Sequence, residues 1–188
     1  IVGCGRSGTG FLAHFINANF QRCGHEQVFD VCGHTGNSSL EYESSWYAVP
    51  YLNLLPRETR ILHIVRSPCH VIRSFHRMGV FSNSPWQHLT KGNGGAFLRS
   101  GLINPKRTLG RINYVLAHRR FLSRHLPESQ GIPEAKRIEL YWRSWNKKIE
   151  AAAANRSTYM RLRIEDVDQE RHLIKDFLDL PSAAFPEN

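Results

Sequence analysis

The chain begins with IVGCGRSGTG (residues 1–10), a short apolar segment that runs into four closely spaced glycines. The next segment, TGFLAHFINANFQRCG (9–24), has helical periodicity and ends at Gly24, a common stop signal. Its apolar stripe consists of Phe11, Leu12, Phe15, Ile16 and Phe20. The order is therefore strand, glycine-rich loop and helix. Since free N–H groups and the helix dipole favour an anion at the start of a helix, this order predicts a phosphate-binding loop.

Strands and helices alternate along the rest of the chain. RILHIV (60–65) is a continuous apolar run typical of a central parallel strand, and Ser67-Pro68 supplies an N-cap and a first-turn proline for the next helix. The remaining segments are a short strand at 27–31, a helix or turns at 43–56, a long loop at 79–107, helices at about 106–126 and 134–154, a strand at 158–164, and a final helix capped by Asp168 and ended by Pro181. This alternation predicts an α/β fold with a parallel sheet, formed as a single domain over 1–188.

Composition limits the classes of partner. Lys and Arg total 25 against 16 for Asp and Glu, and the resulting formal charge of +9 favours anionic partners. No nucleic-acid recognition motif accompanies this charge, so we expect no nucleic-acid partner. No apolar run approaches the roughly 20 residues that cross a bilayer. Because Ile1 already lies in a strand-like segment, we expect an excerpt of a longer chain, with any targeting or anchoring segment outside it.

Two familiar phosphate-binding loops match the opening stretch in part. Gly3, Gly5 and Gly8 fit the dinucleotide pattern G-x-G-x-x-G, and Asp30 is near the position of its ribose-binding acid, so a nicotinamide-dependent oxidoreductase is one alternative. The Walker A pattern fails, because Thr9 and Gly10 replace its lysine and its magnesium-binding hydroxyl. A third type of loop keeps the glycine cradle and supplies the cation from Arg6.

Two stretches carry a resemblance to a known family. GCGRSGTGFL (3–12) resembles the 5′-phosphosulfate loop of sulfotransferases that use 3′-phosphoadenylyl sulfate (PAPS), and ILHIVRSPCHVIRSFHR (61–77) resembles their 3′-phosphate motif. The resemblance implies a three-layer, P-loop-like fold whose mostly parallel sheet has helices on both faces. It also implies PAPS as sulfuryl donor without a metal, a small-molecule or carbohydrate acceptor, and a location in the bacterial cytoplasm or the eukaryotic Golgi lumen. The donor-binding residues that it implies are Gly5, Arg6, Ser7, Gly8, Thr9, Gly10, Arg66 and Ser74.

The resemblance also implies catalytic residues. Arg6 would stabilise charge on the departing phosphate oxygen, and Glu26, in RCGHE (22–26), would be the general base. His25 is the alternative base; neighbouring strand residues point in opposite directions, so we expect only one of the two to face the donor. A non-catalytic relative that binds nucleotide or acidic glycan is a further alternative. The repeated triplet C-G-H at 23–25 and 32–34 leaves a zinc site open as another.

Overall fold

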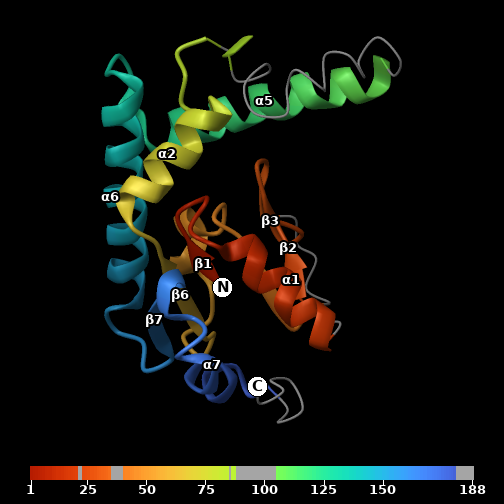
Figure 1. Ribbon diagram of the computed structural model, residues 1–188, viewed down its shortest axis with the longest axis vertical. Helices are drawn as coiled ribbons and strands as arrows, with labels where there is room; N and C mark the ends of the chain where they lie inside the picture. Colours follow the sequence, from red (N-terminus) through yellow and green to blue (C-terminus); the bar gives the residue numbers. More distant parts are fainter. Residues whose placement is uncertain (21–22, 35–39, 85, 88–104, 181–188) are drawn as a thin grey trace. The chain divides into compact units, whose positions relative to one another are not determined.

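A computed structural model describes residues 1–20, 23–34, 40–84, 86–87 and 105–180 (Figure 1). The chain divides into two compact units, one of Ile1–Arg66 with Trp145–Asn188 and the other of Ser67–Ser144. One division falls between strand β6 (Ile61–Val65) and helix α2 (Pro68–Met78), and the other falls inside helix α6 (Glu134–Ala153). A division inside a continuous helix changes neither composition nor periodicity, which is why the sequence pattern did not indicate it.

The main sheet lies in the first unit and has the strand order β1-β6-β7. Strand β1 (Val2–Gly3) pairs with β6, and β6 pairs with β7 (Tyr159–Arg163), in both cases in parallel (Figure 1). All five residues of β6 are buried, as expected for a central strand. The α/β class and the strands predicted at 60–65 and 158–164 are therefore confirmed.

Helices contact both sides of β6. Leu62 and Ile64 pack with Leu12 and Ile16 of α1 (Thr9–Phe20) and with Ile174 of α7 (Arg171–Leu178). The intervening residue of the strand, His63, points the other way and bonds to Asn146 of α6. The prediction that Phe11 belongs to the buried stripe of α1 is wrong, and the side chain of Phe20 lies outside the described part. Phe11 is 58% exposed, because the buried stripe is centred on Leu12 and Ile16 and Phe11 lies about 100° away around the helix.

Two further sheets of two strands each are formed by residues that lie between β1 and β6 in the sequence. Strand β2 (Cys23–His25) pairs in parallel with β5 (Tyr42–Ser44), while β3 (Phe29–Asp30) and β4 (Gly33–His34) form an antiparallel hairpin. The strand predicted at 27–31 is therefore reduced to two residues and lies outside the main sheet. The apolar segment at 43–56 contains the 3₁₀ helix η1 (Val49–Leu54).

The start of α7 differs from the prediction. Asp168 does not cap the helix; it forms an ion pair with Arg171 at 2.6 Å, and the chain first makes the 3₁₀ turn η3 (Ile164–Asp166) before the helix begins after Glu170. An aspartate three residues before an arginine can bond to that side chain instead of to the helix amides.

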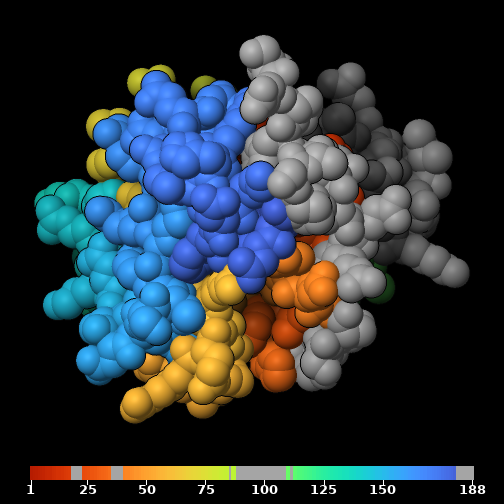
Figure 2. All heavy atoms as spheres, turned by 90° about the horizontal axis from the view of Figure 1, so that it is seen from below, coloured from red at the N-terminus to blue at the C-terminus, as the bar shows by residue number. Residues whose placement is uncertain are grey.

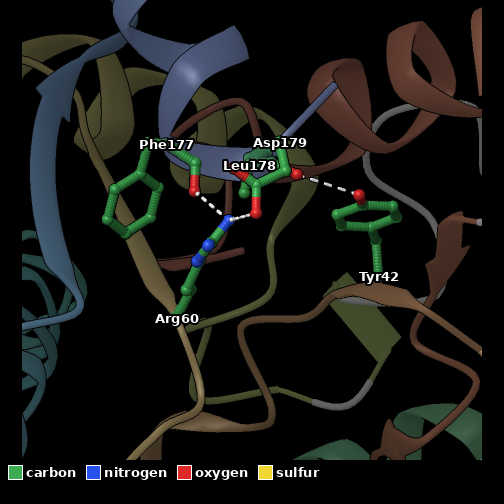
Figure 3. Close-up of polar contacts among 5 residues, drawn as sticks. All are labelled: Tyr42, Arg60, Phe177, Leu178 and Asp179. Carbon is green, nitrogen blue, oxygen red and sulfur yellow. Dashed lines mark hydrogen bonds and ion pairs between the residues drawn. The ribbon is translucent and has the colours of Figure 1, made fainter. Parts of the chain in front are cut away.

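The end of α7 is held by two side chains, Arg60 just before β6 and Tyr42 in β5. Arg60 donates to the Phe177 carbonyl at 3.0 Å and pairs with Asp179 at 2.5 Å, and the Tyr42 hydroxyl donates to the Leu178 carbonyl at 2.9 Å (Figure 3). A cavity of about 750 Å³ lies beside these contacts, between the amber residues near 52–61 and the orange residues near 40–43 on the face seen in Figure 2.

The second unit is helical in its described part. It contains α2, α5 (Pro105–His125), the 3₁₀ helix η2 (Pro127–Ser129) and the first part of α6, so the helices predicted at 106–126 and 134–154 are confirmed. Phe75, Phe81 and Tyr141 form its aromatic core, with ring centroids 5.0–5.4 Å apart. The loop predicted at 79–107 falls mostly outside the described residues. Among the described helices, none has the length and apolar character to cross a membrane.

Candidate functional site

The loop after β1 is closed by its own buried groups. The Ser7 hydroxyl and the Ser7 amide both donate to the Cys4 carbonyl, at 2.6 and 3.1 Å. A Cβ atom at Gly3 would lie 2.4 Å from the Ile64 carbonyl oxygen and 2.4 Å from Ser7 Oγ, so only glycine fits between the loop and β6. Ser7 is fully buried, and its side chain therefore shapes the loop and is not offered to a ligand.

The start of α1 presents unpaired donors. The i→i−4 hydrogen bonds of the helix begin with the Leu12 amide, which donates to the Gly8 carbonyl at 3.1 Å. Among the described residues, the amides of Thr9, Gly10 and Phe11 and the Thr9 hydroxyl have no hydrogen-bond acceptor. Three amides and a hydroxyl at a helix N-terminus are the donors that a phosphate or sulfonate group requires.

Arg66 connects the two sequence motifs. It follows β6 directly, and its Nη1 donates to the Arg6 carbonyl at 3.2 Å. The carboxyl ends of the parallel neighbours β1 and β6 thus bring the glycine-rich loop and the strand-end arginine together. The backbone at Arg6 has φ of 69°, a conformation that non-glycine residues rarely adopt.

His25 lies over the first turn of α1. Its Nδ1 is 2.9 Å from the Ser44 carbonyl and donates to it, so in the neutral form of the ring the lone pair is on Nε2. A Cβ atom at Gly10 would be only 2.8 Å from that Nε2. The imidazole therefore occupies the space that a side chain at position 10 would need, and it presents a basic nitrogen beside the unpaired amides.

Glu26 lies close to His25 but outside the strand. Strand β2 ends at His25, and Glu26 has φ of 56°. Burial is the main cause that raises the pKa of the Glu26 carboxyl, while the nearby His25 and a hydrogen bond from the Trp46 side chain act in the opposite direction. Because Glu26 leaves the extended conformation, the alternation that we expected to separate the two side chains does not apply.

The predicted site residues fall into two groups. In the first unit, Arg66 contacts the loop at Arg6 and His25 lies beside Gly10, while Glu26 lies near His25. Ser74 lies on α2 in the second unit. Sequence reasoning missed Ser44 and Trp46, which orient His25 and Glu26. Both belong to the segment SSWY (44–47), which we predicted as part of a helix or turns at 43–56 and assigned no site residue.

The structure gives no support to the two competing predictions, a dinucleotide site with Asp30 and a zinc site at the two C-G-H triplets. Asp30 accepts a bond from the Cys32 amide at 2.7 Å within the β3–β4 hairpin, so it does not end a strand of the main sheet as a ribose-binding acid would. Cys23, His25, Cys32 and His34 are all described, and no group of three or more metal-ligating side chains occurs among the described residues. The four cysteines are free thiols.

Comparison of this chain with family models, with curated proteins and with solved structures finds no match in any of the three.

Proposed function

We propose that this chain is a sulfotransferase that moves a sulfuryl group from PAPS to a hydroxyl or amine acceptor. The proposal includes a three-layer, P-loop-like arrangement around the parallel sheet, which goes beyond the α/β class described above. The observation that carries it is the bond from Arg66 to the Arg6 carbonyl, because it joins the two stretches that resemble the donor-binding motifs.

The donors at the loop fit the charged groups of PAPS. The unpaired amides of Thr9, Gly10 and Phe11 and the Thr9 hydroxyl suit the 5′-phosphosulfate, and Arg66 offers a forked, permanently charged donor to the 3′-phosphate. Ser74 is assigned to the same phosphate by the resemblance alone. Ser7 supports the loop from within and contributes no side-chain donor.

The reaction requires a base and stabilisation of the leaving group. A bond forms between sulfur and the acceptor oxygen or nitrogen, and the bond between sulfur and the phosphate oxygen breaks. The proton of the acceptor passes to Glu26, and charge on the departing oxygen is stabilised by Arg6, Thr9 and the loop amides. Glu26 suits the role of base because burial raises the pKa of its carboxyl; His25, through Nε2, is the second candidate.

Calorimetric titration tests donor binding. We would titrate the chain with 3′,5′-adenosine bisphosphate, adenosine 5′-phosphate, ATP and NAD, without added metal. Strong preference for the bisphosphate is expected, and Arg66→Ala should weaken it by roughly 10- to 150-fold, since charge-assisted bonds contribute about 1.5–3 kcal/mol each. Arg143→Ala is the matched control, because Arg143 is exposed and, within the described part of the chain, its ion pair is with Glu139 on its own helix. Equal binding of all four ligands, or preference for NAD, would reject the proposal.

Substitution of the base separates an enzyme from a non-catalytic relative. Glu26→Gln should retain bisphosphate binding and lose turnover of PAPS with a suitable acceptor by roughly 10²- to 10⁴-fold. The same assay, repeated over a range of pH, distinguishes the two candidate bases. If kcat/KM no longer rises with pH in Glu26→Gln but still rises in His25→Gln, the base is Glu26. The reverse pattern would assign it to His25.

A further inference from the structure

The second unit contains a separate polar cavity of about 300 Å³. Its walls come from residues 80–83, from α5, and from the segment 129–137 at the start of α6. Among the described residues that line it, two are arginines, Arg119 and Arg137, and none is acidic. All of these residues belong to one compact unit.

Arg137 is anchored on several sides by neutral acceptors. Its Nε donates to the Ser129 carbonyl at 3.0 Å, and its Nη1 donates to the Phe81 carbonyl at 2.9 Å. Its Nη2 donates to Asn83 Oδ1 at 2.6 Å and to the Ile132 carbonyl at 2.8 Å. These contacts fix the guanidinium in the cavity wall without neutralising its charge.

Arg119 carries a second positive charge into the same cavity. It donates from Nη1 to the Ser82 carbonyl at 2.9 Å and from Nη2 to the Asn83 carbonyl at 3.1 Å. A guanidinium has five N–H donors, and the others on Arg119 have no acceptor among the described residues. Neither arginine makes an ion pair with a described residue. Burial and the charge of Arg137 both lower the pKa of Arg119, as expected for two neighbouring like charges.

We propose that this cavity binds an oxyanion, a carboxylate or sulfate group, between Arg119 and Arg137. Arg137, held rigidly by four acceptors, would orient the group, and the remaining N–H donors of Arg119 would bond to its oxygens. Planar forked donors match the geometry of such groups, and a cavity of about 300 Å³ suits a single acidic unit. The inference stands apart from the proposed function, because it uses no residue of the glycine-rich loop.

Sulfate, glucuronate and uncharged glucose are suitable probes. Calorimetric titration and thermal unfolding would be measured at constant ionic strength, balanced with sodium chloride. Since the Gly3–Gly10 loop is a second candidate anion site, all variants would be prepared both in the wild-type and in the Arg66→Ala background. Arg119→Gln is the test variant, because Arg137 has too many structural bonds to remove cleanly. Arg120→Gln is its matched control, as Arg120 is the next residue on α5 and is exposed.

We expect sulfate or glucuronate to bind and to raise the unfolding temperature, in both backgrounds, while glucose does neither. Arg119→Gln should weaken the affinity about tenfold or more, and Arg120→Gln should leave it unchanged. Glucuronate alone would identify an acidic sugar as the ligand class, and sulfate alone an inorganic or ester sulfate. Absence of binding, or equal loss in both variants, would overturn the proposal. The proposal would also be overturned if Arg119→Gln lowered the unfolding temperature by the same amount with and without the anion, since a purely structural arginine behaves in this way.

Discussion

At the scale of single residues, Gly10 is a position where the neighbouring His25 side chain crowds any substitution. The His25 ring stands over it, so Gly10→Ala should gain none of the helix propensity that alanine normally provides. Gly110 on α5 is the matched control: a Cβ atom there meets nothing within 4 Å, and Gly110→Ala should raise the free energy of unfolding by up to about 1 kcal/mol. Urea unfolding measures both. Equal stabilisation by the two substitutions would contradict the placement of His25.

His63 is a residue-scale determinant of pH sensitivity. It is fully buried, with Nε2 2.8 Å from Asn146 Oδ1 and Nδ1 2.9 Å from the Tyr159 hydroxyl, and burial lowers its pKa from 6.5 to about 4. The unfolded chain therefore binds more protons between these values, and the free energy of unfolding should fall as the pH falls from about 6.5 toward 4, by up to about 1.4 kcal/mol per pH unit.

Stability curves at several pH values test this dependence. His63→Gln should remove the contribution of this group between pH 6.5 and 4, whereas His14→Gln, at an exposed position on α1, should leave the slope unchanged. An identical slope in wild type and His63→Gln would show that another group is responsible.

At the scale of elements, Arg156 attaches the end of η1 to the end of α6. Its Nη2 donates to the carbonyls of Leu52 at 3.1 Å and Leu55 at 2.8 Å, its Nη1 donates to that of Pro56, and its Nε to that of Ala152 at 3.3 Å. Arg156→Lys keeps the charge but cannot reach several carbonyls at once, so we expect a loss of about 1.5–3 kcal/mol in the free energy of unfolding.

Arg143→Lys serves as the control for Arg156→Lys, because Arg143 makes an exposed i,i+4 pair whose loss should cost about 0.5 kcal/mol or less. Denaturant titration of both variants measures the difference. A loss at Arg156 no larger than the loss at Arg143 would mean that the four bonds do not hold the two elements together.

At the scale of the whole molecule, ligand binding and stability are linked. If the proposed function holds, 3′,5′-adenosine bisphosphate at one hundred times its Kd should stabilise the folded chain by about 2.7 kcal/mol. Because the chain carries a formal charge of +9, this stabilisation at a constant ligand concentration should shrink as sodium chloride increases. Thermal unfolding with and without ligand measures both effects. The same stabilisation by NAD would contradict the prediction.

Periodicity was a reliable guide to the positions of the longer helices and of two strands of the main sheet. This applies to α1, α5, α6, β6 and β7, whose positions were predicted to within a few residues. It failed at Asp168, where a local ion pair replaced the expected cap, and at 27–31, where two residues join a hairpin outside the main sheet. In both places the local structure is set by one side-chain contact or one turn. Such contacts produce no repeating pattern of apolar residues in the sequence.

The sequence by itself determined the α/β class, the strand–loop–helix order and the positions of Gly3, Arg6 and Arg66, because spacing along the chain controls which groups follow a strand. Only the tertiary structure decided that Arg66 bonds to the loop, that Ser7 is buried, and that His25 lies over Gly10. It also decided that Arg119 and Arg137 share one cavity. The reason is physical: these contacts join residues far apart in the chain, and the packing of whole elements, not local preference, sets their distances.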